Sequence, residues 1–384
     1  MRILRVSIIL LAVLLSMVSC NKKDNSAFIV YNLDEVSNRD EIKFSDFMDN
    51  IHLVKLELVP EHPVSPYMNL WIGDKHILLI SRKTVLQYTS DGIFIRELII
   101  NGKGPEDFGE VDYCDVDEGK DIFYFYDHES PGRIRRIDLR SGELLKSTKL
   151  PTEERWLLAG FVVYNSRLLC FTNNFSSVDY RYFYLNEAGD IEYGCSKKAY
   201  LEEWPQISTT PYLNEAQGEV TYKQVRDTLF FLAKDTLEID MIVRVDNYFS
   251  PGTGVTKGSS PQLILNGEEH RLLTKTEVEI VSSENGIRFE DYGTSYFLID
   301  RKEGTITQAS HFYNDYFDII QEDAEFSSND AKAYLVIEAI EIMSLLEDAP
   351  FDINADPEIK ERIASLKETI SENDNPYLLI GTLK

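Results

Sequence analysis

The sequence has few residues of the kinds that carry most metal and redox chemistry. Its 384 residues include only 4 Cys and 6 His, and neither a Cys-x-x-Cys nor a His-Glu-x-x-His spacing occurs. The Gly-x-Ser-x-Gly motif of serine hydrolases and a phosphate-binding glycine loop are also missing. The histidines are scattered along the chain, so the sequence predicts no catalytic residue and no metal ligand.

Basic residues and long apolar runs are also scarce. Lys and Arg number 39 against 65 Asp and Glu, and the formal net charge is -26. This charge argues against nucleic acid as a partner, because binding to a phosphate backbone needs a basic surface. A hydrophobic content of 43%, with 20 Gly and 13 Pro, also excludes a disordered chain, a collagen and a membrane protein with several spans.

One apolar run stands at the start of the chain. It extends from Val6 to Val18 after Arg2 and Arg5, and it is followed at once by polar residues. A spanning helix needs about 20 apolar residues, so residues 1–19 are interpreted as a cleaved export signal. The sequence that ends at Cys20 resembles a bacterial lipobox, in which the thiol of the new N-terminal cysteine carries lipid.

Lipid on Cys20 would anchor the mature protein to a membrane of the cell envelope. We expect the outer membrane, on its periplasmic or its outer face. The alternative is an ordinary cleavage site at which Cys20 is incidental. The other cysteines, Cys114, Cys170 and Cys195, allow three disulfide pairings or none.

The rest of the chain shows strand patterns and almost no helical period before residue 329. Short runs that are apolar throughout, such as Ile122–Tyr126 and Tyr296–Ile299, are typical of strands covered on both faces. Polar turns recur between such runs and end at Gly92, Gly142, Gly189, Thr236 and Gly304. A spacing of about 40 to 50 residues with only β signals is typical of propeller blades. The rival interpretation is a sandwich of unrelated hairpins.

Five turns and the remaining chain predict an all-β fold, a six-bladed β-propeller over residues 51–384 after a tether and lead-in segment over residues 20–50. The last spacing is longer than the others, and residues 250–254 and 258–261 are interpreted as an inserted loop within it. To close the ring, we expect residues 51–58 to pair with residues 377–383.

A small C-terminal helical insertion is predicted in the last blade, over about residues 329–371. Asp356 suits a helix cap and Pro357 the first helical position, and an apolar stripe with helical spacing follows. We expect these helices to cover the outer side of the blade. A surface for docking a partner is the alternative.

Several segments resemble one family. The turn Asn101–Phe108, with Gly102, Gly104 and Pro105, is similar to a turn of the six-bladed β-propeller lipoproteins of Bacteroidetes, which are related in pattern to NHL-repeat propellers. Further similar segments are 44–57, 226–230 and 372–378, so the resemblance spans nearly the whole mature chain. It implies an exported, lipid-anchored propeller from a family whose members mostly have no assigned activity.

Candidate binding residues lie near predicted blade starts. Arg155, Trp156 and Trp204 are proposed to line a ligand-binding mouth, although tryptophans more often fill the space between blades. The acidic stretch Asp115–Asp121 superficially resembles a calcium loop, but it lacks the distal Glu, and a turn between strands is the favoured interpretation. No cofactor is otherwise predicted.

These observations favour a binding module that captures a glycan, a peptide or an envelope protein. A metal-assisted lyase or lactonase-like hydrolase at the propeller axis is the less favoured alternative, because sequence motifs do not report a site assembled from separate blades. A structural role, with the acidic surface or the C-terminal helices docking to another envelope component, is the third hypothesis. The sequence leaves the ligand and the oligomeric state open.

Overall fold

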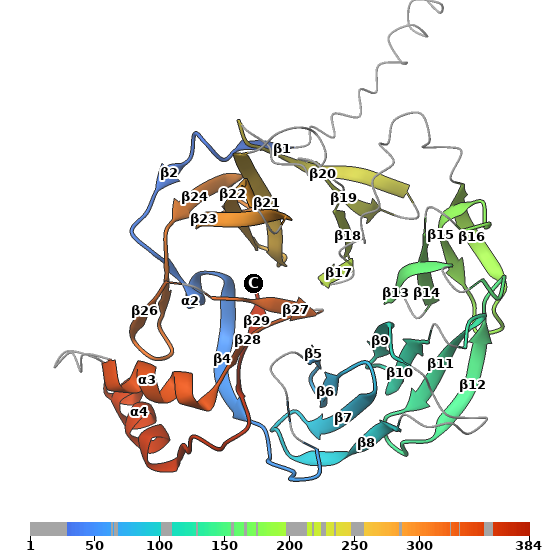
Figure 1. Ribbon diagram of the computed structural model, residues 1–384, viewed down its shortest axis with the longest axis horizontal. Coiled ribbons are helices and arrows are strands. Elements are labelled where there is room, and N and C mark those ends of the chain that lie inside the picture. The colour runs from blue at the N-terminus through green and yellow to red at the C-terminus, as the bar shows by residue number, and fades with distance from the viewer. Residues whose placement is uncertain are drawn as a thin grey trace, which may run out of the picture.

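The computed structural model describes residues 29–384 except 63, 65–67, 101–109, 128–129, 155–156, 165–166, 174–175, 197–212, 217–218, 224–227, 234–235, 247–256, 284–285, 323, 330 and 349–355. Within this part of the chain, six sheets of four or five strands stand in a ring around a central axis (Figure 1). The predicted six-bladed β-propeller is confirmed, and the rival sandwich interpretation is wrong. In the same part, no helix has the length and apolar character needed to span a membrane.

The first strand of each blade lies nearest the axis and the fourth lies at the rim (Figure 1). Blade 1 consists of β5 (Asn69–Ile72), β6 (His76–Ile80), β7 (Thr84–Thr89) and β8 (Phe94–Ile100). Blade 2 consists of β9 (Tyr113–Asp117), β10 (Ile122–Tyr126), β11 (Arg133–Asp138) and β12 (Leu144–Lys149). Blade 3 consists of β13 (Leu158–Tyr164), β14 (Arg167–Thr172), β15 (Tyr180–Leu185) and β16 (Ile191–Ser196).

The second half of the ring repeats this order. Blade 4 consists of β17 (Leu213–Ala216), β18 (Glu219–Lys223), β19 (Thr228–Ala233) and β20 (Thr236–Arg244). Blade 5 consists of β21 (Lys257–Asn266), β22 (His270–Ser283), β23 (Gly286–Asp300) and β24 (Thr305–Ala309). Blade 6 takes β27 (Ser327–Asn329), β28 (Lys332–Ile337) and β29 (Tyr377–Leu383) from the C-terminal part of the chain and β4 (Met48–Lys55) from the N-terminal part.

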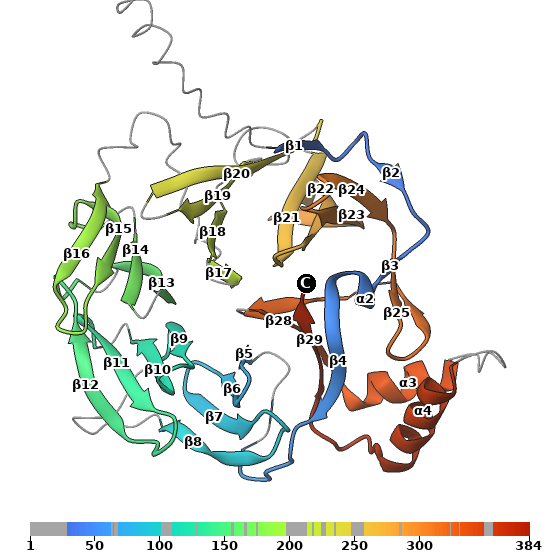
Figure 2. The same ribbon diagram turned by 180° about the vertical axis from the view of Figure 1, so that it is seen from behind.

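Strand β4 closes the ring. It pairs antiparallel with β29, with Val54 opposite Leu378 and Met48 opposite Leu383, so the predicted pairing of the two chain ends is confirmed. Both views of the ring show these two strands side by side (Figure 2). Strand β29 is paired with β28 on one side and with β4 on the other, so the closure leaves no unpaired edge on β29.

The N-terminal segment runs along the outside of the ring before it reaches β4 (Figure 2). Strand β1 (Ile29–Asn32) pairs parallel with β20, and β2 (Ser37–Asn38) pairs parallel with β24. A small sheet then joins β3 (Ile42–Lys43) to β25 (Phe312–Asn314) and β26 (Ile319–Gln321), and the short helix α2 (Phe44–Phe47) follows. Residues 29–47 are therefore part of the packed fold, and they hold the rims of blades 4 and 5.

The predicted helical insertion lies between β28 and β29 of blade 6, outside the ring (Figure 1). It contains α3 (Ala339–Asp348) and α4 (Pro357–Thr369). Asp356 caps α4 by accepting a hydrogen bond from the backbone N–H of Glu358. Ile342, Leu346 and Ile363 are buried in the core of blade 6, so the helices cover the blade, as expected.

The predicted inserted loop is wrong for residues 258–261, and residues 250–254 lie outside the described residues. Gly258 to Pro261 belong to β21 and pair with β22. The extra length of this repeat instead comes from the hairpin of β22 and β23, whose strands have 14 and 15 residues. Gly, Ser and Pro suggested a loop, but pairing along a long neighbouring strand overrides that local preference.

Among the described side chains, the core consists of apolar layers between neighbouring blades, and blades 1 and 2 bury both faces. Alternate residues of β10 show this: Phe123 and Phe125 pack against blade 1, whereas Tyr124 and Tyr126 pack against blade 3. The run Ile122–Tyr126 is apolar throughout for this reason.

We expect the closing strand pair to contribute strongly to stability. Leu378 in β29 is fully buried between blades 6 and 1, so Leu378→Ala should lower the free energy of unfolding by about 2–5 kcal/mol. Leu144→Ala is the matched control, because Leu144 is 41% exposed at a rim, and it should cost less than about 0.5 kcal/mol. Chemical denaturation of both variants measures the difference. Equal stability of the two variants would contradict this role of the closure.

Candidate functional site

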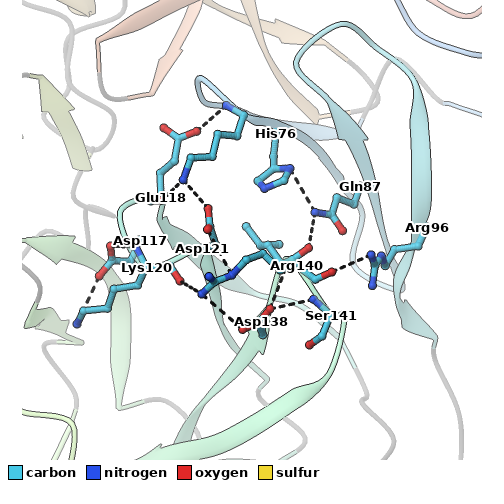
Figure 3. Close-up of polar contacts among 12 residues, drawn as sticks. His76, Gln87, Arg96, Asp117, Glu118, Lys120, Asp121, Asp138, Arg140 and Ser141 are labelled. Carbon is cyan, nitrogen blue, oxygen red and sulfur yellow. Dashed lines mark hydrogen bonds and ion pairs between the residues drawn. The ribbon is translucent and has the colours of Figure 1, made fainter.

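In blades 1, 2 and 3, one face of the ring carries the turns between the first and second strands and between the third and fourth strands, and we call it the turn face. Here a polar network joins blades 1 and 2 (Figure 3). Lys75 Nζ donates to Asp121 Oδ1 at 2.8 Å, and the backbone N–H of Lys75 donates to Glu118 Oε1 at 2.8 Å. Arg140 adds an ion pair to Asp121 at 3.5 Å. The network therefore fixes the β5–β6 turn against the β9–β10 turn.

A buried amide forms the inner part of this network (Figure 3). Gln87 is fully buried, and its Nε2 donates to the carbonyl oxygen of Leu139 at 2.8 Å and lies 3.3 Å from Nδ1 of His76. With that amide nitrogen as the donor, Nδ1 must be unprotonated. Burial lowers the pKa of His76 below its ordinary value, although Asp121 and Glu118 oppose the shift. The hydrogen bond from Gln87 therefore requires the neutral form of His76.

The stretch proposed as a calcium loop forms the β9–β10 turn. Asp115 Oδ2 accepts a hydrogen bond from the backbone N–H of Val163 in blade 3 at 2.5 Å. Asp117 lies 3.6 Å from Lys120 Nζ, and Asp121 binds Lys75 and Arg140. These carboxylates thus contact groups of the protein itself. Among the described residues, no group of three or more His, Cys, Asp and Glu is placed to hold a metal ion.

The network continues from blade 2 to blade 3 and ends at a cleft. Lys120 Nζ lies 3.4 Å from Glu187 Oε1 in the β15–β16 turn. Beside this contact is an open cleft whose enclosed part has room for about one water molecule. Blade 2 lines it with Tyr124, Arg136 and Thr148. Blade 3 lines it with Val163, Arg167, Leu168, Leu185, Asn186 and Glu187.

The blade 2 wall of the cleft holds three hydrogen-bonding side chains. Arg136 donates from Nε to the carbonyl oxygen of Lys146 at 2.6 Å and hydrogen-bonds to Tyr124. Burial raises the pKa of Tyr124, which keeps the phenol protonated at neutral pH. Thr148 is 1% exposed, and within the described residues its hydroxyl has no hydrogen-bond partner. A buried hydroxyl without a partner costs about 1–3 kcal/mol.

The blade 3 wall is apolar inside and charged at its mouth. Val163, Leu168 and Leu185 form the apolar part. The guanidinium of Arg167 lies 4.5 Å from the centre of the Tyr184 ring and 3.8 Å from Glu192. Tyr184 lies on the opposite side of β15 from Leu185, so the charge of Arg167 is directed away from the cleft.

The sequence contains one signal for this cleft that the motif search missed. Although the whole chain has a net charge of -26, the segment from residue 133 to residue 149 is basic. It covers β11 and β12 and contains Arg133, Arg135, Arg136, Arg140, Lys146 and Lys149 against Asp138 and Glu143. Charge counted along the chain, rather than a motif, would have pointed to this blade.

None of the residues nominated from the sequence is among those that line the cleft. Cys20, Arg155, Trp156 and Trp204 are outside the described residues, as is the turn Asn101–Phe108. Arg155 and Trp156 come between β12 and β13, and Trp204 comes between β16 and β17. The cleft residues Tyr124, Arg136 and Thr148 were not among the nominations.

Three described side chains test other expectations. Trp71 is 5% exposed and packs between blades 1 and 2, which confirms the core interpretation for this tryptophan. Cys114 and Cys170 are both free. Each of the three pairings open to the sequence would use one of them, so Cys114, Cys170 and Cys195 form no bridge with one another.

Comparison with known proteins defines the family. The profile of a family described as a domain of unknown function, DUF4934, matches residues 28–382. The chain belongs to the DUF4934 family. None of the curated proteins compared with this DUF4934 chain is similar to it in sequence.

Solved structures support the fold of this DUF4934 protein. A protein of Bacteroides fragilis whose export is inferred is 12% identical, with a TM-score of 0.62 over 93% of this chain and 100% of that chain. A DUF4221 member from Bacteroides vulgatus is 10% identical, with a TM-score of 0.48 over 88% of this chain and 97% of that chain. The WD40 domain of Neurospora crassa Pan2 is 9% identical, with a TM-score of 0.34 over 70% and 71% of the two chains. The first similarity supports the propeller fold; the other two are too weak to carry an argument.

The half-buried His76 predicts a pH dependence of stability. Because the folded-state pKa of His76 is lowered, the unfolded chain binds more protons as pH falls below about 6.5, and the native state loses stability. We expect the stability of the wild type relative to His76→Gln to decrease between pH 7.5 and pH 5.5. Urea denaturation at both pH values measures it. His52→Gln, at an exposed histidine, is the control, and a His76→Gln difference that is constant or grows at low pH would refute the prediction.

Proposed function

We propose that this DUF4934 protein is an exported, lipid-anchored β-propeller that captures a ligand at the bacterial cell envelope. The observation that carries the binding part is the cleft between blades 2 and 3. It is lined by three aliphatic side chains and by polar ones that can form hydrogen bonds. Its enclosed part has room for about one water molecule, so a glycan or a peptide would have to bind across its open mouth.

The export and anchoring part rests on the N-terminal sequence. Arg2 and Arg5, the apolar run to Val18 and the lipobox-like sequence before Cys20 support it. Strand β1, which begins at Ile29, pairs with the rim strand β20 of blade 4. A lipid on Cys20 would therefore stand nine residues before a rim strand of the ring.

The anchor can be tested with one cysteine variant. In a bacterial host that processes lipoproteins, the wild type should incorporate a clickable palmitate analogue and fractionate with membranes, and Cys20→Ala should do neither. Cys114→Ala is the matched control, because Cys114 is a free cysteine within the folded ring, and it should behave as the wild type. An intact mass that shows unmodified Cys20 in the membrane fraction would contradict lipidation.

The binding site can be tested with a near-isosteric variant, Thr148→Val. Removal of a buried, unpartnered hydroxyl should leave stability unchanged or slightly raised. In a thermal-shift screen of glycans, short peptides and metabolites, we expect a compound that raises the Tm of the wild type to lose most of that shift in Thr148→Val. Thr305→Val, at an exposed threonine of blade 5, is the control and should keep the full shift. Equal shifts in both variants would place the site elsewhere.

A further inference from the structure

The long hairpin of blade 5 has a strand edge that its own sheet does not cover. Strand β23 pairs with β22 from Gly286 to Asp300, but β24 covers the other edge of β23 only from Tyr296 onward. Among the described residues, no strand pairs with that edge before Tyr296. An open edge presents backbone N–H and C=O groups that can pair with another strand.

The N-terminal segment covers neighbouring edges but not this one. Strand β1 pairs with the rim strand β20 of blade 4, and β2 pairs with the rim strand β24 of blade 5. The open part of β23 extends beyond β24 and contains neither Lys nor Pro up to Asp291. These are residues that commonly prevent pairing at a strand edge, so this edge lacks that protection.

A β-bulge sets the length of the edge that can pair regularly. Tyr292 stands between two consecutive residue pairs of the β22–β23 ladder and is the extra residue of the bulge. The regular open segment is therefore Gly286–Asp291. Beside the bulge, Gly293 is exposed, and a Cβ added there would meet no described atom within 4 Å. The space next to this edge is thus open.

The geometry of strand pairing limits how a second copy can use the same edge. In an antiparallel ladder, a residue that directs its N–H and C=O to the partner lies opposite one that does the same, and such residues alternate along a strand. Two identical strands related by a twofold axis therefore pair about a residue and not about a peptide bond. Within the open segment, a centre at Arg288 pairs residues 286–290 and a centre at Phe289 pairs residues 287–291. Other centres pair fewer residues.

Charge distinguishes these two registers. A centre at Arg288 places two arginines opposite each other, and like charges at directly opposite positions destabilise a ladder. A centre at Phe289 instead places Arg288 opposite Glu290 of the second copy, and does so twice. It also places Phe289 opposite itself, and aromatic pairs stabilise strand pairing. The remaining pair, Ile287 with Asp291, carries no like charges, so the edge is complementary to itself in this register.

We propose that this protein forms a twofold dimer in which residues 287–291 of β23 pair antiparallel with the same residues of a second copy. The pairing would join the blade 5 sheets of two rings. An interface of this length is small, so we expect weak association that depends on concentration. The dimer does not use the cleft between blades 2 and 3, and it is independent of the proposed ligand capture.

Sedimentation velocity of the mature full-length protein, produced without lipid, over about a hundredfold range of concentration tests the proposal. The wild type should pass from monomer to dimer as its concentration rises. Arg288→Glu places Glu opposite Glu, and Glu290→Arg places Arg opposite Arg, so each variant alone should stay monomeric. An equimolar mixture of the two variants restores both Glu–Arg pairs and should form a heterodimer.

Two exposed residues at the other end of β23 are the matched controls. Lys302→Glu and Glu303→Arg change the net charge by the same amounts as the two test variants, but they lie in the β23–β24 turn. Both controls should dimerise as the wild type does. An unchanged Tm of each variant and the return of the dimer in the mixture separate loss of pairing from loss of folding.

Each result decides what pairs with the edge. A wild type that is monomeric at every concentration would overturn the self-pairing and leave the edge to a strand of a different protein. A dimer that persists in both Arg288→Glu and Glu290→Arg would place the contact elsewhere on the ring. Loss of the dimer in both variants without its return in the mixture would overturn the register centred on Phe289.

Discussion

The pairing of β4 with β29 is the contact on which the rest of this structure depends. Every blade has two apolar faces, so an open array would leave one face of blade 1 and one face of blade 6 in water. By taking its outer strand from the N-terminal part and its inner strands from the C-terminal part, blade 6 brings these faces together. Val54 and Leu378, paired across the closure, lie in the same buried layer as Tyr88 of blade 1. Closing the ring therefore buries the facing apolar surfaces of blades 1 and 6.

The same geometry decides where polar chemistry can occur. Along each strand the side chains alternate between two neighbouring blades, and both sides are packed with aliphatic and aromatic groups. The ion pairs of Lys75 with Asp121 and of Lys120 with Glu187 lie in the turns, where they join successive blades across the turn face. The cleft lies where the apolar layer between blades 2 and 3 meets the polar turn face. The ring of Tyr124 belongs to the apolar layer, whereas its hydroxyl reaches the polar one at Arg136.

Arg136 differs from the other cations near the cleft in the groups that it contacts. Acidic residues outnumber basic ones in the chain, and the other cations near the cleft have carboxylates close to them. Arg136 is held instead by a carbonyl and a phenol, which orient the guanidinium without neutralising it.

The sequence by itself determined the features that depend on local pattern and on repetition. The turn spacing predicted the blades, the need to close the ring predicted the pairing of residues 51–58 with residues 377–383, and the Asp356-Pro357 start predicted α4. Only the tertiary structure decided the parallel pairing of β1 and β2 on two rims, the long hairpin of blade 5 and the meeting of Tyr124, Arg136 and Thr148 with blade 3. Strand pairing and the packing of one blade on the next join residues far apart in the chain, and the periodicity of a single strand contains no information about which neighbour it will meet.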